Sequence, residues 1–212
     1  MNVNNQILSD ITVHMKYAKH LSEVNRRETW YELVDRNKEM HLKKFPELTT
    51  DIEWAYQYVL DKKVLPSMRG LQFSGKPIDI NPARGYNCAY VSMNDTKAFQ
   101  EIMYLLLSGC GVGLSVQRHH VEKLPEIRKP NVNNTRRYMI GDSIIGWSNA
   151  IKALMKSYFG QKNIKYIFDP SDIREKGATL ITSGGKAPGS EPLMKCLNNI
   201  TTLLDNKKNG TK

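Results

Sequence analysis

Residues 84–118, RGYNCAYVSMNDTKAFQEIMYLLLSGCGVGLSVQR, decide the fold of this chain. Tyr86 to Val91 alternates in hydropathy and is rich in strand formers, with Cys88 in its middle. A helix is predicted from about Lys97 to Leu107, because apolar residues recur there at helical spacing. Asn94 to Thr96 supplies polar side chains suited to the N-cap. The stretch therefore begins as a strand followed by a helix.

A glycine-rich turn over residues 108–113 ends this helix, because glycine accepts the left-handed backbone that a C-cap needs. Residues 114–116 then begin a second strand. A strand, a helix and a parallel returning strand form the elementary unit of an α/β sheet or barrel. Within the turn, Gly111 and Gly113 either let a ligand approach bare backbone or serve only as the connection between helix and strand.

The composition is that of an ordinary globular protein. At 212 residues, with 40% hydrophobic and 25% charged residues, the chain is long enough for one real core and a small accessory lobe. No apolar run is long enough for a membrane span, and the N-terminus does not look like a signal peptide. The three cysteines show no CxxC or His-rich spacing, which argues against a disulfide scaffold and structural zinc. We expect a cytoplasmic protein with reduced thiols.

The net charge of +10 is the one unusual feature of the composition. Its lysines and arginines are scattered in short pairs, which is typical of a solvated surface. The same charge also suits the binding of phosphates, on free nucleotides or on nucleic acid. No basic helix with interleaved aromatic residues is present, so a dedicated nucleic-acid-binding module is the weaker alternative. Steep salt dependence of binding would distinguish it.

The rest of the chain gives a coarser prediction. Residues 7–62 are predicted to be helical, and Trp30, Tyr31 and Trp54 are interpreted as packing aromatics. Residues 75–85 are predicted to be a turn-rich connector, and residues 120–134 an exposed basic loop.

In the C-terminal half, a helix with an apolar stripe is predicted from residue 144 to 158, and strands at residues 165–168 and 177–182. A glycine-rich loop over residues 183–190 lacks P-loop spacing. The last helix, residues 192–204, has apolar positions that need a partner surface. We interpret this face as a sign that the chain is part of a larger sheet or barrel.

Cys88 has two interpretations when its sequence context is taken alone. A buried cysteine behaves as a small hydrophobic residue. A redox thiol instead needs a second cysteine close enough to form a disulfide. Cys110, in the glycine turn, is interpreted as a spacer where a small residue is tolerated, and Cys196 is interpreted as structural. His119 and His120 have no further ligand at a useful spacing, so no metal site is predicted.

The chain resembles the N-terminal part of a monomeric, adenosylcobalamin-dependent (class II) ribonucleoside-triphosphate reductase. The matching motifs keep their order and rough spacing over nearly the whole chain. They are YAK at 17–19 with RRETW at 26–30, LPSMRGL at 65–71, YNC at 86–88, AF at 98–99 with residues 102–106, GCGVGLSV at 109–116, KLPEI at 123–127, DS at 142–143 with GW at 146–147, SDIR at 171–174 with GA at 177–178, and GGKAPG at 184–189.

This resemblance implies an α/β fold: an N-terminal helical region, residues 1–63, followed by the first part of a ten-stranded α/β barrel, residues 64–212. It also implies reduction of ribonucleoside triphosphates to 2′-deoxyribonucleotides. In that family cobalamin generates a thiyl radical on one cysteine, and two further cysteines supply electrons by closing a disulfide. A deoxynucleotide effector regulates the reaction, and a dithiol reductant such as thioredoxin restores the cysteines.

The resemblance also implies roles for individual residues. Cys88 aligns with the first cysteine of the reducing pair. Ser67, Asn87 and Gly111 fall where the family contacts its substrate. Four charged residues fall near the effector region: Asp95, Asp172, Arg174 and Lys176.

The family chain is several times longer than this one, and adenosylcobalamin is expected to be held mainly by the part that does not match. We therefore expect this chain to need a complementary C-terminal reductase segment for activity. The alternative is a catalytically inactive fragment that keeps nucleotide binding or an interaction role. Neither a membrane nor direct nucleic-acid binding is expected.

Overall fold

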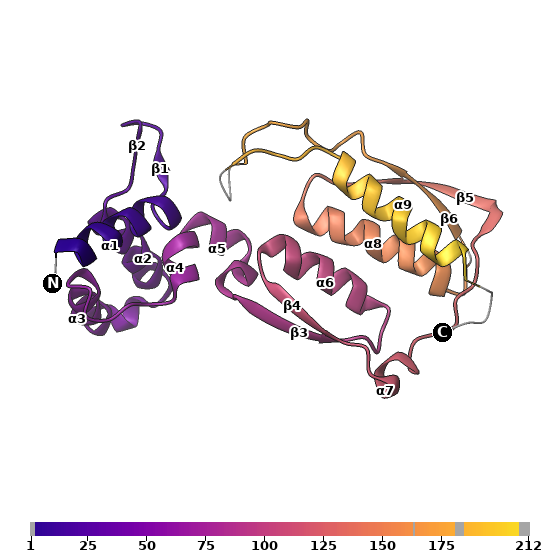
Figure 1. The fold of residues 1–212 in the computed structure, drawn as a ribbon, viewed down its shortest axis with the longest axis horizontal. Helices are drawn as coiled ribbons and strands as arrows, with labels where there is room; N and C mark the ends of the chain where they lie inside the picture. Colours follow the sequence, from indigo (N-terminus) through magenta and orange to yellow (C-terminus); the bar gives the residue numbers. More distant parts are fainter. Residues whose placement is uncertain (1–2, 163, 181–184, 208–212) are drawn as a thin grey trace. The chain divides into compact units, whose positions relative to one another are not determined.

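A computed structural model describes residues 3–162, 164–180 and 185–207 (Figure 1). The chain divides into two compact units, Met1–Tyr86 and Asn87–Lys212. The domain boundary predicted at residue 63 stays a prediction.

The first unit is helical. Its elements, in chain order, are α1 (Val3–Lys16), β1 (His20–Leu21), β2 (Arg26–Arg27), α2 (Trp30–Lys44), the 3-10 helix η1 (Pro46–Leu48), α3 (Thr49–Leu60), α4 (Met68–Phe73), α5 (Lys76–Ile80) and the 3-10 helix η2 (Pro82–Gly85). β1 and β2 pair antiparallel.

The core of this unit is formed by α2, α3 and α4. Leu33, Val34, Tyr56, Val59 and Leu71 are its buried members. The helical prediction for residues 7–62 is largely confirmed, but the β1–β2 hairpin interrupts it. The aromatic prediction is wrong for two residues, because Tyr31 and Trp54 are exposed.

The start of α2 illustrates how local chemistry fixes a helix end. The Thr29 hydroxyl accepts from the Glu32 backbone N–H, and the Glu32 carboxylate accepts from the Thr29 backbone N–H. This reciprocal capping box satisfies two donors that a helix start leaves unpaired. The connector predicted at residues 75–85 is in fact α5 and η2. Pro77 is compatible with α5, because proline is tolerated in the first turn of a helix.

A buried polar cluster ties α2 to α4. The Arg36 guanidinium donates to both carboxylate oxygens of Glu28, at 2.7 and 2.8 Å, and to the carbonyls of Leu71 and Ser74. The Lys19 ammonium also donates to the Ser74 carbonyl, at 2.8 Å. Burial, together with the nearby Arg36 charge, lowers the pKa of Lys19 to about 8. Each buried charge in the cluster has a hydrogen-bonding partner, as buried charges require.

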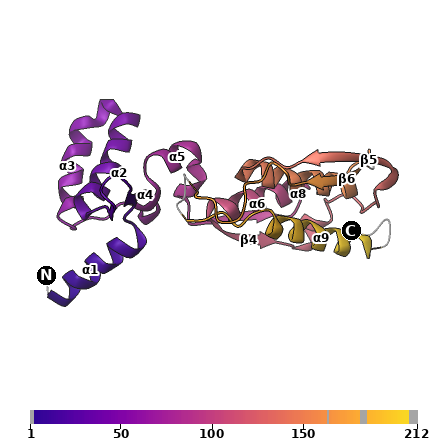
Figure 2. The same cartoon turned by 90° about the horizontal axis from the view of Figure 1, so that it is seen from above.

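The second unit mixes helices and strands (Figures 1 and 2). Its elements are β3 (Cys88–Ser92), α6 (Lys97–Ser108), β4 (Gly111–Ser115), α7 (Arg118–Val121), β5 (Asn131–Met139), α8 (Ile144–Phe159), β6 (Ile164–Asp169) and α9 (Glu191–Asp205). β3 pairs parallel with β4, and β5 pairs parallel with β6.

The predicted strand–helix–strand unit is confirmed as β3, α6 and β4. Gly109 adopts the left-handed conformation at the C-cap of α6, with φ of 95°. The Asp95 carboxylate accepts from the Lys97 backbone N–H at 2.9 Å and so caps the helix start. The prediction is wrong about the second strand, which begins at Gly111 rather than residue 114. Two of the glycines assigned to the turn, Gly111 and Gly113, are strand residues.

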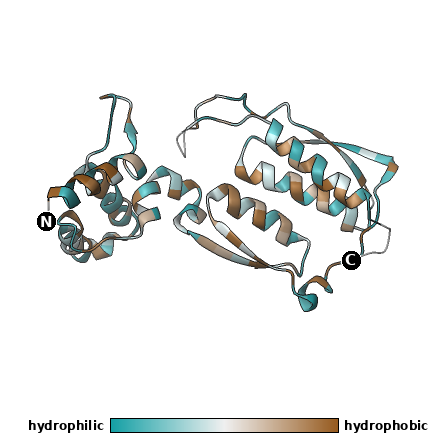
Figure 3. Cartoon of the chain, viewed as in Figure 1, coloured by the Kyte–Doolittle hydropathy of each residue, from teal (hydrophilic) through white to brown (hydrophobic). Residues whose placement is uncertain are grey.

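α8 and α9 share the main core of this unit. The stripe predicted on residues 144–158 is confirmed, because Ile151, Leu154 and Tyr158 are buried. Figure 3 colours the ribbon by hydropathy and shows hydrophobic residues along α8. Leu193 and Leu197 of α9 pack into the same core. The prediction that the apolar face of the last helix needs a surface outside the chain is therefore wrong, because α8 provides that surface.

One loop prediction is confirmed in part, and one strand prediction is not confirmed in the described residues. The loop predicted at residues 120–134 is irregular over residues 122–130, but its two ends belong to α7 and β5. The polar residues at the start of β5 hide the strand pattern. Of the strand predicted at residues 177–182, residues 181–182 lie outside the described part. In the described part, Thr179 makes a single bridge with Lys186. Among the described residues, no helix is both long and apolar enough to cross a membrane.

Candidate functional site

The parallel β3–β4 sheet has one covered face and one open face. On the covered face, Val91 forms a buried cluster with Met93 and with Ala98 of α6. Successive side chains alternate across a strand, so Cys88 and Tyr90 point to the opposite face. Both are exposed. The open face therefore presents a thiol and an aromatic ring from β3.

The register of the sheet places each of these side chains beside a glycine. Cys88 pairs with Gly111, and Tyr90 pairs with Gly113. The Gly111 backbone N–H donates to the Asn87 carbonyl at 2.8 Å. Three of the predicted site residues, Asn87, Cys88 and Gly111, are thus brought together. Cys88 is the first residue of its strand and not the middle one.

The glycines of β4 are not required by the packing of the chain itself. A Cβ added to Gly111 would lie 3.8 Å from the Asn87 carbonyl oxygen, the nearest atom of the described residues, and one added to Gly113 would lie 3.9 Å from the Ala89 carbonyl oxygen. These are ordinary contact distances, and neither glycine has a positive φ. The missing side chains instead leave bare backbone next to the Cys88 thiol, where a ligand can approach.

Ser67 belongs to the first unit, where it is the N-cap of α4. Its hydroxyl accepts from the Gly70 backbone N–H at 3.3 Å, and the residue is exposed. A local structural role therefore accounts for the serine, and its exposure leaves the hydroxyl within reach of a ligand.

The site residues that the sequence missed lie at the carboxyl end of β4. The Ser115 hydroxyl is hydrogen bonded to His120 Nδ1 at 2.8 Å, and the His119 and His120 rings lie 4.0 Å apart. Partial desolvation lowers the pKa of His120, and the neighbouring charges of His119 and Lys123 lower it further. The five-position spacing of Ser115 and His120 matches no known motif, so no sequence signal indicates this pair. Among the described residues, no cluster of three or more metal-ligating side chains is present.

The four effector candidates lie in two places. The carboxylate of Asp95 caps α6, and the Lys97 backbone N–H lowers the pKa of that carboxyl. Arg174 follows β6 and donates from Nε to the Asp142 carboxylate at 2.6 Å. Asp172 and Lys176, on the same segment, are exposed.

Both places are connected to α8. Phe99, near the start of α6, stacks on Phe159 at the end of α8, with ring centroids 6.1 Å apart, and the Gln100 side-chain amide donates to the Asn149 side chain in the first half of α8 at 2.7 Å. Asp142, which holds Arg174, precedes Ser143, the N-cap of α8.

Comparisons with known proteins converge on one family. Residues 115–204 match the insertion domain of B12-dependent ribonucleotide reductase. The chain is 27% identical to a probable adenosylcobalamin-dependent ribonucleoside-triphosphate reductase of Dictyostelium discoideum, over 94% of this chain and 30% of that protein. It is 26% identical to the adenosylcobalamin-dependent ribonucleoside-triphosphate reductase of Lactobacillus leichmannii, over 94% of this chain and 36% of that protein.

A solved structure has the same fold. A crystal structure of a B12-dependent (class II) ribonucleotide reductase superimposes with a TM-score of 0.78 and 24% identity, covering 93% of this chain and 37% of that one. The predicted α/β class is confirmed by this match. The chain spans about a third of the length of these relatives.

Proposed function

On the premise that this chain is a relative of the adenosylcobalamin-dependent ribonucleoside-triphosphate reductases, we propose that it is the N-terminal segment of such an enzyme. The complete enzyme would convert ribonucleoside triphosphates to 2′-deoxyribonucleotides. Because the chain spans only about a third of its relatives, we propose that activity needs a complementary C-terminal segment.

The proposed role of Cys88 is that of a reducing thiol. Replacing the 2′-hydroxyl of a ribonucleotide by hydrogen takes up two electrons and releases water. Two cysteine thiols supply those electrons together with two hydrogens and become one disulfide. A dithiol reductant such as thioredoxin would then return both thiols to the reduced form by exchange. The second thiol of the pair would come from the complementary segment.

The pairing of Cys88 with Gly111 carries this proposal. An exposed thiol lies on the open face of a parallel sheet, beside a strand glycine that the packing does not demand. A reducing thiol must reach the ribose, and bare backbone leaves room for it. A structural cysteine would be expected on the covered face, among Val91 and its neighbours.

The other predicted residues complete the proposal. Asn87 and Gly111 would contact the substrate at the open face, and Ser67 is the third residue that we propose as a substrate contact. Asp95, Asp172, Arg174 and Lys176 would belong to the region that responds to a deoxynucleotide effector. The protein would work in the cytoplasm.

Adenosylcobalamin would start the reaction by generating a thiyl radical when bound. The cavity of the first unit is too small to hold it. The apolar cavity of the first unit, about 440 Å³, has the size that takes drug-sized molecules, and a corrinoid with its nucleotide arm is larger. We therefore propose that the cofactor is held mainly by the complementary segment.

The test is reconstitution with that segment. The chain is co-expressed with the remaining two thirds of a relative's sequence, and cobalamin-dependent deoxynucleotide formation is measured with a dithiol reductant. Activity that is lost in Cys88→Ser and kept in Cys196→Ser is expected, since Cys196 lies on α9 against the main core. A stable, folded complex without activity, or equal activity in both variants, would contradict the proposal. Binding of nucleotides without any turnover would favour the inactive-fragment alternative.

A further inference from the structure

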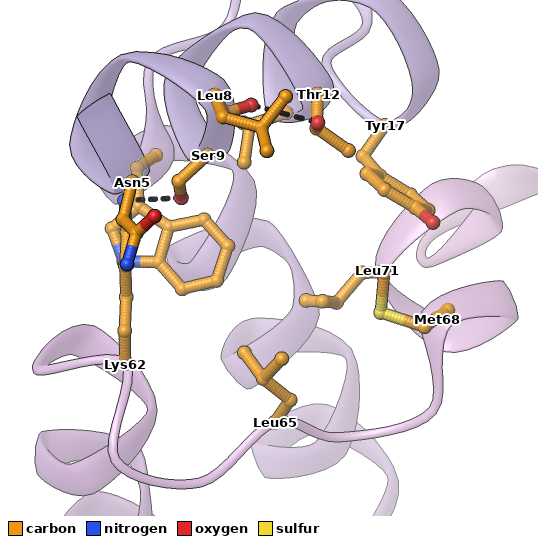
Figure 4. Close-up of a pocket in the computed structure, with 11 residues that line it drawn as sticks. Asn5, Leu8, Ser9, Thr12, Tyr17, Lys62, Leu65, Met68 and Leu71 are labelled. Atoms are coloured by element: carbon orange, nitrogen blue, oxygen red, sulfur yellow. Dashed lines mark hydrogen bonds between the residues drawn. The ribbon is translucent and has the colours of Figure 1, made fainter.

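A cavity of about 440 Å³ lies in the first unit, beneath α1 (Figure 4). α1 contributes five of the lining residues, yet none of its own residues, all of them described, is buried. Protein interiors are close packed and hold few voids larger than a water molecule, whereas ligand pockets measure about 300–1,000 Å³. α1 therefore borders a space of ligand size, while Val13 of this helix also packs against the neighbouring core.

One side of the cavity is apolar. Leu65, Met68, Leu71 and Tyr17 surround it in the close-up of Figure 4. The indole of Trp30 also lines it, and its Nε1 already donates to the Leu60 carbonyl at 3.0 Å. The indole N–H is thus satisfied away from any guest, so the ring offers an apolar surface. These walls suit an apolar ring system or chain.

The other side carries one cation. Lys62 lies with Asn5 and Ser9 at this side of the cavity in Figure 4, and its Nζ is 3.0 Å from the Ser9 hydroxyl and 5.3 Å from the Trp30 ring centroid. The backbone φ of Lys62 is 57°, in the left-handed region that favours glycine. A lysine at a helix end where glycine would fit better indicates that interactions of the lysine side chain offset the cost of this backbone conformation.

The charge of Lys62 is only loosely compensated. Its Nζ lies 3.3 Å from the Asp10 carboxylate, whose side chain is 59% exposed while that of Lys62 is 17% exposed. Ion pairs with an exposed partner contribute little, so another anion can take the place of Asp10. We propose that this cavity binds a small amphipathic molecule, with its apolar body against Trp30 and Leu65 and its anionic group on Lys62. The proposal does not depend on the reductase function.

Two fluorescent probes that differ by one charge test the proposal on the full chain. One is 8-anilino-1-naphthalenesulfonate, and the other is its uncharged counterpart N-phenyl-1-naphthylamine. Lys62→Met is expected to weaken the anionic probe about tenfold, the loss of one charged contact, and to leave the uncharged probe within about twofold. Asp10→Asn is expected to strengthen the anionic probe, because it removes the competing carboxylate.

Matched variants separate the cavity from general surface binding. Lys63→Met and Asp61→Asn remove a neighbouring exposed ion pair that does not line the cavity, and both are expected to leave the two probes unaffected. Thr12→Trp, at an exposed lining position of α1, should exclude both probes without loss of helical circular dichroism. Equal effects of Lys62→Met and Lys63→Met on the anionic probe would overturn the proposal, as would undiminished binding in Thr12→Trp.

Discussion

Replacing Arg36 with methionine should destabilise the first unit far more than the same replacement at Arg26. Both guanidiniums lie 2.7 Å from a glutamate carboxylate oxygen, but their burial differs. The side chains of Arg36 and Glu28 are 16% and 4% exposed, and those of Arg26 and Glu32 are 47% and 38% exposed. The two variants therefore compare one interaction in two environments.

The expected loss follows from what Arg36→Met leaves behind. The Glu28 carboxylate would remain buried with the Lys19 backbone N–H as a donor, at 3.0 Å. Removing one partner of a buried ion pair costs about 3–5 kcal/mol. The methionine keeps much of the apolar stem of arginine, so we expect about 3 kcal/mol less free energy of unfolding. Arg26→Met should leave the unfolding midpoint unchanged, because exposed ion pairs contribute little.

The assay is urea unfolding followed by tryptophan fluorescence in a Trp147→Phe background. The remaining tryptophans, Trp30 and Trp54, both belong to the first unit, so the signal reports that unit alone. Combining Glu28→Gln with Arg36→Met should recover part of the loss, because the uncompensated charge is then removed as well. Equal midpoints for Arg36→Met and Arg26→Met would refute the reasoning from burial.

Three further changes have defined outcomes. Gly146→Ala should destabilise the second unit by about 1–3 kcal/mol, because the new Cβ would lie 2.7 Å from the backbone carbonyl carbon of Gly141. Gly70→Ala should be neutral or stabilising, because the nearest atom to its new Cβ would be 3.5 Å away. Urea unfolding of each variant measures the change in stability. The free energy of unfolding should rise as the pH increases from about 8 towards 10.5, because the lowered pKa of Lys19 lets the folded chain lose the Lys19 proton at a lower pH than the unfolded chain. After discounting for solvent exposure, the expected rise is about 1–2 kcal/mol. Lys19→Met should abolish this rise when unfolding is measured as a function of pH. A thiol reagent should modify the exposed Cys88 in the native chain. Cys110, which is 3% exposed, should react only after unfolding. Peptide mass spectrometry measures the order of modification, and the opposite order would show that the open face of the sheet is closed.

The sequence predicted the parts of the fold that local chemistry determines. The β3–α6–β4 unit was predictable because strand alternation, the Asp95 cap and the Gly109 C-cap are all local signals. The motif resemblance brought Cys88 and Gly111 into one site, and the sheet register agrees with that grouping.

The parts that failed depend on tertiary contacts. β5 has the polar sequence NVNNTRRYM, and its strand structure comes from pairing with β6. The apolar face of α9 could not be matched to α8 without knowing that the two helices meet. The Lys62 contacts with α1 join residues more than 50 positions apart in the sequence. No local sequence pattern therefore predicts the cavity beneath that helix.

The most direct test of the Cys88 assignment is disulfide mapping after one turnover. The reconstituted enzyme is given ribonucleoside triphosphate without an external reductant, quenched with an alkylating agent and analysed by peptide mass spectrometry. Cys88 is expected to become part of a disulfide in the same amount as the deoxynucleotide formed. Product formation with Cys88 still alkylated as a thiol would contradict the assignment.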